Sequence, residues 1–336
     1  MTEWNKMKKV NRRDFLRYTG VAGGALFLNV DGGVAMSSTG SRVALVKTDD
    51  RKKGVKASLR TLKINPVKGK NVLIKPNFNT ADIPPGSTHN DTLVALIEEV
   101  WEMGAKSISL GERSYPPTRE VMEEKGILPI LDKLNVKVID FDILDKKDWV
   151  LFKPKKSHWP NGFRIARPIL DAECLISTCC LKTHQYGGIF TFSLKLHVGV
   201  VPTSRHGYEY MRELHSSPHQ RRMIAEINEP FKPSLIVLDG IDAFVDEGPM
   251  TGKRAKAEVF LASTDRVAID AVGVAILKHL GSNDSIMKPR IFEQEQIARA
   301  VELGLGVSSP VEIEIMPSDK NSQEYKGRID EILKKG

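Results

Sequence analysis

The chain has 336 residues, of which 41% are hydrophobic and 27% are charged, and its formal net charge is +8. This length allows one large or two modest domains with a substantial core. The basic residues are spread along the chain rather than gathered in one stripe with interleaved aromatic residues, which argues against a nucleic-acid partner and fits a small anionic molecule. With three cysteines, the chain can form neither a disulfide-rich scaffold nor an iron–sulfur cluster held by four of its own cysteines.

The N-terminal segment has the pattern of an export signal. Arg12 and Arg13 precede an apolar stretch at residues 18–28, which is shorter than the ~20 residues that a membrane-spanning helix needs. A twin arginine indicates the Tat route, on which the Tat translocase is a transient partner. We therefore expect a Tat-type signal peptide at residues 1–35, with cleavage after Ala35, and a periplasmic or other extracytoplasmic location. An uncleaved signal would instead tether the protein to a membrane.

The first half of the remaining chain alternates between strand and helix patterns. Strands are expected at residues 42–47, 72–75, 106–110 and 136–141, with helices at 90–103 and 118–124. The helix at 90–103 has Leu93, Leu96 and Val100 on one side, Asn90 or Asp91 as a cap, and Gly104 at its end. This rhythm predicts an α/β fold with a mostly parallel sheet flanked by helices.

The middle of the chain is less regular, and the same rhythm returns after it. A hairpin or edge excursion at residues 149–152 and 163–166 forms an irregular central insertion, and two lobes could divide near residues 145–170. Strands follow at 173–178, 235–239 and 257–263. A helix at 265–280, an amphipathic segment at 291–303 and a strand at 311–316 complete the pattern.

Polar residues follow several of the expected strands. In open α/β sheets, ligands bind beyond the carboxyl ends of the strands, so these residues form the candidate site. Glu112 and Arg113 follow the strand at 106–110. A helix start with polar residues beside it can hold an anion. The expected substrate-binding residues are Lys75, Asn77, Thr88 and His89.

Histidine gives a sharper signal, because five of the eight histidines lie between positions 184 and 219, namely His184, His197, His206, His215 and His219. Imidazoles bind metals or move protons, and a neighbouring lysine holds an anion or acts as a base. The expected catalytic residues are Lys182, His184 and Lys195. Residues expected to orient them or to bind a divalent metal are His197, Asp239, Asp242 and Asp270. Because the spacing matches no known metal motif, the cofactor stays open.

Several short segments occur in the order found in one known family. They include Lys75-Pro76-Asn77, Leu181-Lys182-Thr183-His184, Ser193-Leu194-Lys195, Asp239-Gly240-Ile241 and Asp265-Arg266-Val267-Ala268-Ile269-Asp270. Over about residues 70–280 the chain resembles the domain of unknown function 362 family (DUF362), and a domain of this type would occupy residues 36–336. It departs from the family pattern at Leu196-His197, where the family usually has an asparagine after the lysine.

The resemblance implies properties that the residues alone do not. Members of this family are often fused or linked to ferredoxin-type iron–sulfur modules, and some carry Tat signals. Because this chain has too few cysteines for such a module, we expect a member without it and an iron–sulfur redox partner. The set of histidines and lysines is also similar to that of lactate racemase, which uses histidines and a lysine around a nickel cofactor; this is an analogy of residue types.

Two functions fit these observations. The first is an exported enzyme that acts on a small anionic substrate with a His, Lys and Asp site, linked to a metal or to redox chemistry. The alternative is a non-catalytic exported protein that binds a ligand or a metal and serves a redox system as an accessory.

Overall fold

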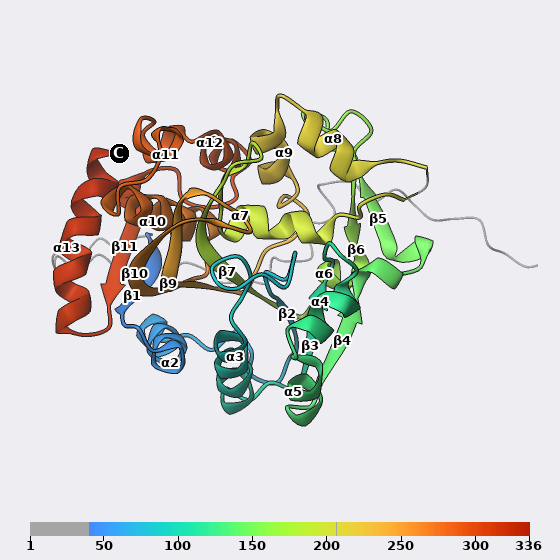
Figure 1. The fold of residues 1–336 in the computed structure, drawn as a ribbon, viewed down its shortest axis with the longest axis horizontal. Coiled ribbons are helices and arrows are strands. Elements are labelled where there is room, and N and C mark those ends of the chain that lie inside the picture. Colours follow the sequence, from blue (N-terminus) through green and yellow to red (C-terminus); the bar gives the residue numbers. More distant parts are fainter. Residues whose placement is uncertain (1–39, 206) are drawn as a thin grey trace, which may run out of the picture. The chain divides into compact units, whose positions relative to one another are not determined.

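The structure is a computed structural model that describes residues 40–205 and 207–336, and these described residues belong to one compact unit (Figure 1). The predicted signal peptide, with Arg12, Arg13 and the cleavage site after Ala35, lies outside the described residues, as does His206. Among the helices that the structure does describe, none is long and apolar enough to cross a membrane.

A nine-stranded sheet runs through this unit. Its strands are β1 Ser41–Lys47, β2 Asn71–Lys75, β3 Ser107–Glu112, β4 Val136–Asp140, β7 Cys174–His184, β8 Ile189–Thr191, β9 Leu235–Glu247, β10 Gly252–Ser263 and β11 Ile313–Pro317. The spatial order is β11-β1-β10-β9-β7-β2-β3-β4, and β8 pairs with β7. The run from β9 to β4 is parallel, as is β1 with β11, whereas β10 is antiparallel to both its neighbours. The expected mostly parallel α/β sheet is thus confirmed.

Helices cover both faces of the sheet (Figure 1). Their bounds are α2 Arg51–Leu62, α3 Asn90–Glu102, α4 Thr118–Glu124, α5 Leu128–Lys133, α6 Arg167–Leu170, α7 Ser193–Leu196, α8 Tyr210–Ser216, α9 Gln220–Glu226, α10 Arg266–His279, α11 Asp284–Met287, α12 Glu295–Glu302 and α13 Lys320–Lys335. Short 3₁₀ turns are η1 Phe141–Ile143, η2 Lys146–Asp148, η3 His197–Val200, η4 Ile291–Glu293 and η5 Pro310–Glu312. One face carries α2, α3, α4 and α5, and the other carries α7, α9, α10, α12 and α13.

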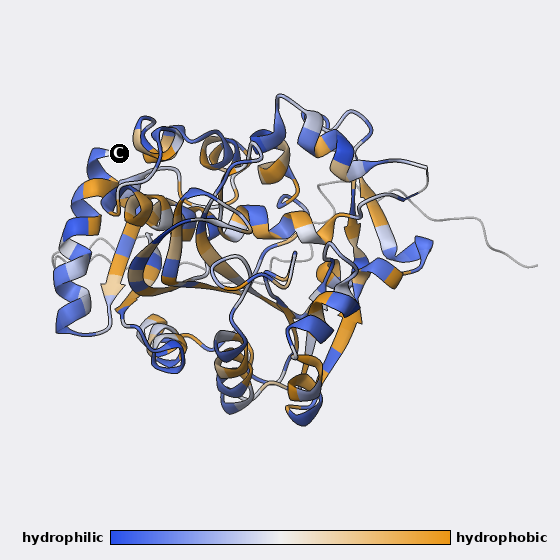
Figure 2. Cartoon of the chain, in the orientation of Figure 1, coloured by the Kyte–Doolittle hydropathy of each residue, from blue (hydrophilic) through white to orange (hydrophobic). Residues whose placement is uncertain are grey.

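Alternation along the strands builds a separate apolar core on each face. In β1, Leu45 packs with α10 on one face while its neighbour Val46 packs with α2 and α3 on the other. In β9, Val237 and Leu238 divide in the same way. Figure 2 shows the result as apolar strands with the apolar sides of the helices turned towards them. Helix α10 is buried from Arg266 to Leu277 and is capped by Asp265, as its sequence predicts.

The expected hairpin is present as a separate two-stranded sheet. Strand β5, Trp149–Phe152, pairs antiparallel with β6, Phe163–Ala166. The side chains of Trp149 and Phe163 pack in a third core with Leu73 and Leu175 of the main sheet. The hairpin is therefore anchored to the main sheet by buried apolar contacts.

Several elements differ from the expected bounds. Strand β7 runs on to His184 and β9 to Glu247, well past the apolar segments that predicted them. The segment at 291–303 is not one helix but the turn η4 followed by α12. The sequence patterns also did not predict α2 and α13. Both begin at an aspartate cap, Asp50 and Asp319, and each buries one narrow apolar side in an otherwise polar segment.

Candidate functional site

A cavity of about 650 Å³ lies at the carboxyl ends of β2, β3 and β7. Three parallel neighbours in the sheet therefore deliver their last residues to one place, as open α/β sheets do. The loop after β2, which crosses in front of the sheet beside α7 in Figure 1, forms one wall. Helix α7 and the turn η3 form another wall, and the loop at 248–250 contributes Pro249 and Met250.

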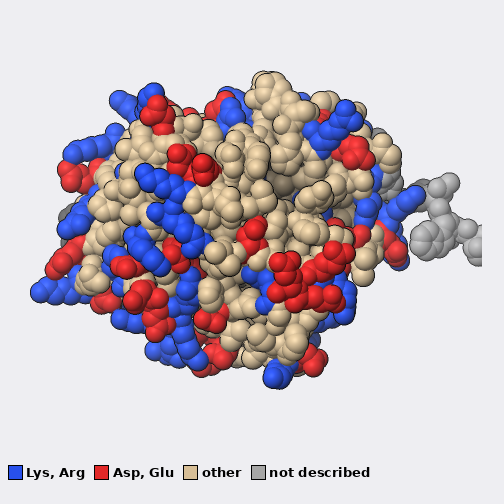
Figure 3. Space-filling view, viewed as in Figure 1, with Lys and Arg blue, Asp and Glu red and all other residues tan. Residues whose placement is uncertain are grey.

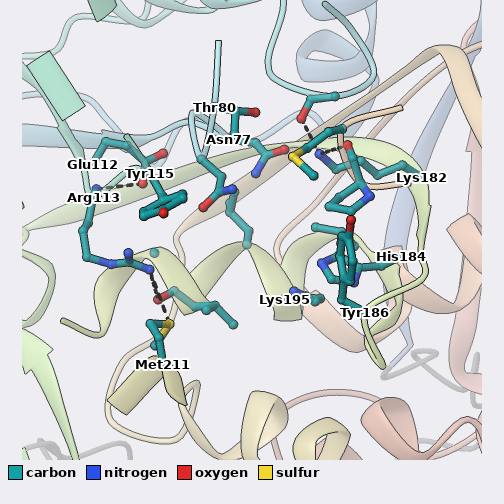
Figure 4. A pocket seen from close by; sticks show the side chains of 18 of the residues that line it. Asn77, Thr80, Glu112, Arg113, Tyr115, Lys182, His184, Tyr186, Lys195 and Met211 are labelled. Carbon is teal, nitrogen blue, oxygen red and sulfur yellow. Dashed lines mark hydrogen bonds between the residues drawn. The ribbon is translucent and has the colours of Figure 1, made fainter. Parts of the chain in front are cut away.

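The expected catalytic residues and two of the expected substrate-binding residues line this cavity. They are Lys182, His184 and Lys195, together with Lys75 and Asn77. Glu112 and Arg113 line it as well, at the end of β3. Figure 4 shows Glu112, Arg113 and Tyr115 on one side and Lys182, His184 and Tyr186 on the other, with Asn77 and Lys195 between them.

A buried ion pair forms part of the cavity wall. The side chains of Lys75 and Glu112 are each 1% exposed, and Nζ of Lys75 lies 2.5 Å from Oε1 of Glu112. Burial lowers the pKa of Lys75 and raises the pKa of Glu112, while their mutual attraction opposes both shifts. A Cβ added at Gly199 would lie 2.8 Å from the Glu112 carboxylate. Only glycine therefore lets η3 pack so closely over this pair.

Arg113 is a second buried cation, and its guanidinium is only partly used by the protein. It donates to Oγ1 of Thr203 at 3.0 Å and to the carbonyl oxygen of Val198 at 3.3 Å. Its Nε is buried and has no partner among the described residues. Burial lowers the pKa of this guanidinium, with Glu112 as the main opposing charge. Arg113 thus has an unused donor at the cavity wall.

Lys182 is held across the cavity by backbone carbonyls. Its Nζ donates to the carbonyl oxygen of Gly86 and, at 3.3 Å, to that of Pro249. Both acceptors belong to loops, so this lysine joins the loop after β2 to the turn after β9. Burial lowers its pKa.

Lys195 and His184 lie side by side at the centre of the site. A Cβ added at Gly188 would lie 2.4 Å from Cε of Lys195 and 3.0 Å from Nδ1 of His184, so both side chains fill the space that a glycine leaves. Burial and the nearby Lys182 lower the pKa of Lys195 to about 7. Burial, followed by the charge of Lys195, lowers the pKa of His184 well below its usual range. A neutral imidazole therefore stands beside an amine that titrates near neutral pH.

Several residues of the cavity wall carry buried polar atoms without partners. Buried side-chain atoms that have no hydrogen-bond partner within the described residues include Oδ1 of Asn77, Nε of Arg113, Nδ1 of His184 and Oγ1 of Thr191. Each belongs to a residue that lines the cavity. An unpaired buried polar atom costs roughly 1–3 kcal/mol, and proteins accept such a cost mainly at functional sites.

The other two expected substrate-binding residues support the walls instead of lining them. Oγ1 of Thr88 accepts a hydrogen bond from the backbone N–H of Asn77 at 2.9 Å, which fixes the loop after β2. His89, and not the expected Asn90 or Asp91, is the N-cap of α3, and its Nδ1 accepts from the N–H of Asp91 at 3.0 Å.

None of the four residues expected to orient the site or to bind a metal lines the cavity. His197 is buried, with its Nε2 2.9 Å from Oγ of Ser177 and its Nδ1 2.7 Å from Oδ1 of Asn228. Asp239 and Asp242 both pair with Arg51, at 3.1 and 3.4 Å. Within residues 40–205 and 207–336, no three His, Cys, Asp or Glu side chains are grouped so that they could hold a metal ion.

Asp270 does orient the site, although it does not line it. Its carboxylate accepts hydrogen bonds from the backbone N–H groups of Ser193 at 2.8 Å and Leu194 at 3.1 Å, which begin α7. Helix α7 carries Lys195, so a buried carboxyl on α10 sets the place of the amine. Burial raises the pKa of Asp270 to about 8, against the effect of these two hydrogen bonds.

Some lining residues gave no signal in the sequence. Tyr115 and Tyr186 come from short loops, Thr191 from the edge strand β8 and Met211 from α8, and nothing in their local pattern marks them. His215 also lines the cavity and belongs to the histidine-rich segment, so its clustering was the available signal.

The chain is similar to one protein family, to a protein of Synechocystis and to one solved structure. The family model described as "Domain of unknown function (DUF362)" matches residues 72–275. A thylakoid-associated protein of Synechocystis sp. is 27% identical over 289 residues, which are 81% of this chain and 85% of that protein. A solved structure, the lactate racemase apoprotein of Thermoanaerobacterium thermosaccharolyticum, aligns with a TM-score of 0.40 and 15% identity, covering 59% of this chain and 50% of that one.

Proposed function

This chain belongs to the DUF362 family, and we propose that it is an enzyme that binds an organic anion and transfers a proton on it. The observation that supports this most directly is that Lys195 and His184 are buried next to the same glycine, Gly188, at a cavity lined by further cations. Two groups that change protonation at or below neutral pH, with unused hydrogen-bonding atoms beside them, have the character of an acid–base site.

The charges around the cavity support an anionic substrate. Four cationic side chains, those of Lys75, Arg113, Lys182 and Lys195, line it together with a single carboxylate, that of Glu112. In a buried site such cations attract an anion far more strongly than they would in water. Arg113 and Lys182 would hold a carboxylate or phosphate group between them, on the two sides seen in Figure 4.

Lys195 supplies the base in this proposal. With its pKa lowered to about 7, a substantial fraction of the amine is neutral at physiological pH. The neutral amine takes a proton from the atom next to the anionic group of the substrate and becomes an ammonium ion, and it later returns the proton. The cations beside it stabilise the negative charge that builds up on the substrate during this step. His184 would donate or accept a hydrogen bond at the reacting group.

Exchange of substrate hydrogen with solvent tests this proposal. The protein is incubated in D₂O with a panel of organic carboxylates and phosphates, and deuterium uptake is followed by NMR. We expect exchange in at least one compound, its loss in Lys195→Met, and a clear decrease in His184→Asn. Lys133→Met, the same change at an exposed residue of α5, is the matched control.

Two outcomes would contradict the proposal. If a compound binds without any exchange, the pocket belongs to a non-catalytic ligand-binding protein. If exchange survives unchanged in Lys195→Met, the base lies elsewhere.

We also propose that residues 1–35 export the protein by the Tat route, on the basis of Arg12, Arg13 and the short apolar stretch after them. A reporter fused after residue 39 should reach the periplasm of a bacterial host. Changing both arginines to lysine should stop export. Export that continues in a host without the Tat translocase would contradict this route.

A further inference from the structure

The cavity is much larger than a small anion requires. Its volume of about 650 Å³ equals roughly 20 water molecules at ~30 Å³ each, and it falls within the range that holds drug-sized ligands. A carboxylate or phosphate group at the cationic residues would leave most of this space to water. The rest of the ligand must account for the remaining volume.

The lining changes in character with depth. Lys75, Arg113, Lys182 and Lys195 are all buried, whereas Tyr115 is 74% and Tyr186 is 53% exposed. Charged groups thus lie at the bottom of the cavity and aromatic rings at its mouth. An apolar opening above a charged floor fits a ligand with one charged end and one apolar end.

Exposed apolar side chains gather at this mouth more than elsewhere on the described part of the chain. Over all the described residues, nine large hydrophobic side chains are exposed. Three of these nine, Tyr115, Tyr186 and Met250, line the cavity. A fourth, Ile83, accepts a backbone hydrogen bond from Gly86, which also lines it. In Figure 3 the middle of the drawn face, around α7 and the loop after β2, carries mostly uncharged side chains. Such a cluster indicates a binding surface.

A ring contact places the side chain of Tyr186, and a backbone hydrogen bond places the main chain of Tyr115. The ring of Tyr186 stands edge-on to that of His184, with centroids 5.8 Å apart. The backbone N–H of Tyr115 donates to the carbonyl oxygen of Asn79 at 2.7 Å, which ties it to the loop after β2. In Figure 4 the two rings stand on opposite sides of the cavity. The mouth thus carries one aromatic ring on each side, and a planar apolar body can lie between them.

We propose that the ligand of this site is an aromatic acid: its anionic end lies among Arg113, Lys182 and Lys195, and its ring system lies between Tyr115 and Tyr186. This inference rests on the proposed function, because it takes the same cationic floor as the place of the anionic group. It adds that an apolar body of one or two rings decides which anions bind.

Four probes separate the two ends of the ligand. They are acetate, acetamide, 1-naphthylacetate and 1-naphthylacetamide, and their dissociation constants are measured by isothermal titration calorimetry. We expect 1-naphthylacetate to bind at least about tenfold tighter than acetate, because its rings leave water at the mouth. We also expect it to bind at least about tenfold tighter than the neutral 1-naphthylacetamide, because the amide lacks the charge that the floor attracts.

Variants of the residues at the mouth and at the floor of the cavity then show which residues cause the preference for the rings and which cause the preference for the charge. The double variant Tyr115→Ala, Tyr186→Ala should reduce the ratio between the 1-naphthylacetate and acetate affinities at least about fivefold. Arg113→Met should reduce the ratio between the 1-naphthylacetate and 1-naphthylacetamide affinities instead. Val311→Ala changes a residue that is 84% exposed and does not line the cavity, and it should leave both ratios unchanged.

The outcomes distinguish this inference from the function on which it rests. Equal binding of acetate and 1-naphthylacetate, both lost in Arg113→Met, would overturn the aromatic body and leave the anion site intact. Equal binding of 1-naphthylacetate and its amide would overturn the anion site, and the proposed function with it. An unchanged ratio in the double tyrosine variant would also overturn the inference.

Discussion

At the scale of single residues, the site is built at the expense of stability. The charge of Lys182 lowers the pKa of the nearby Lys195, and among the described residues neither of these two buried amines forms an ion pair with a carboxylate, since Glu112 pairs with Lys75. Burying a cation without a full partner costs free energy, and proteins accept such a cost mainly at functional sites. Substitutions in the cavity should therefore separate stability from activity.

Lys195→Met should make the protein more stable, and more so at low pH. The pKa of Lys195 is about 7 in the folded protein, below its ordinary value of 10.5. Below pH 7 the folded protein therefore holds a charged, buried amine. Between pH 7 and 10.5 only the unfolded chain binds this proton, so the stability of the wild type rises with pH.

The gain from Lys195→Met in the free energy of unfolding should accordingly be larger at pH 6 than at pH 9, by on the order of 2 kcal/mol. Urea unfolding of both proteins at the two pH values measures it, and Lys133→Met is again the control. A gain that is the same at both pH values would mean that the amine titrates normally.

Gly188→Ala should impair the site with little effect on the fold. The new methyl group would occupy the space 2.4 Å from Cε of Lys195, and the flexible lysine can move more easily than the backbone. We expect a decrease of at least about tenfold in solvent-exchange activity, because a small displacement of a catalytic group is costly. The melting temperature should stay within a few degrees of the wild type. Full activity in this variant would show that the position of Lys195 is not critical.

At the scale of elements, short α7 depends on a neighbour for its place. It has four residues, and the two N–H groups at its start are satisfied by Asp270 of α10. A helix of one turn is not stable by itself, so tertiary contacts must define it. The sequence indicated that Asp270 needs a partner, but the partner lies 77 and 76 residues away and could not be found from local patterns.

Asp270→Ala should therefore loosen α7 and lower activity through Lys195. Two buried N–H groups would lose their acceptor, which costs roughly 1–3 kcal/mol for each unsatisfied group. Asp270→Asn retains one of the two acceptor oxygens and should restore part of the activity and stability. Urea unfolding and solvent exchange measure both effects. An alanine variant with normal exchange would show that α7 holds its position without this cap.

Helix α13 offers a prediction that does not involve the site. Gly327 lies in its interior, is exposed, and has open space where a Cβ would stand. Gly327→Ala should raise the free energy of unfolding by about 0.5–1 kcal/mol, because alanine favours a helix more than glycine does. Solvent exchange should be unchanged. A loss of stability would mean that α13 is not helical at this position in solution.

The element boundaries show how far local patterns reach. The apolar cores of β2, β7, β9 and β10 were readable as short runs of hydrophobic residues, and so was α10 with its cap Asp265. The polar continuations of β7 and β9 could not be predicted in this way, because lysine, histidine and aspartate interrupt the apolar pattern where these strands approach the cavity. The errors in the strand ends therefore fall at the candidate site.

At the scale of the whole described unit, the site follows from topology. Strands β7, β2 and β3 are neighbours and parallel, so the residues that end them, although up to about 110 positions apart in the sequence, meet at one edge. This rule predicted the meeting of Lys75, Asn77, Lys182 and His184. It did not predict that Asp239 and Asp242 lie away from the cavity. The strand order places β9 beyond β7, and Arg51 of α2 pairs with both carboxylates.

The titration of Lys195 is the most direct test of its proposed role as the base of the site. In protein labelled with ¹³C at the lysine side chains, NMR follows each Cε resonance with pH, and the resonance missing from Lys195→Met identifies this residue. We predict a midpoint near pH 7 in the free protein and a higher midpoint when 1-naphthylacetate is bound, because the anion stabilises the charged amine. A midpoint above pH 10, unchanged by the ligand, would mean that Lys195 is an ordinary charged lysine and cannot serve as the base.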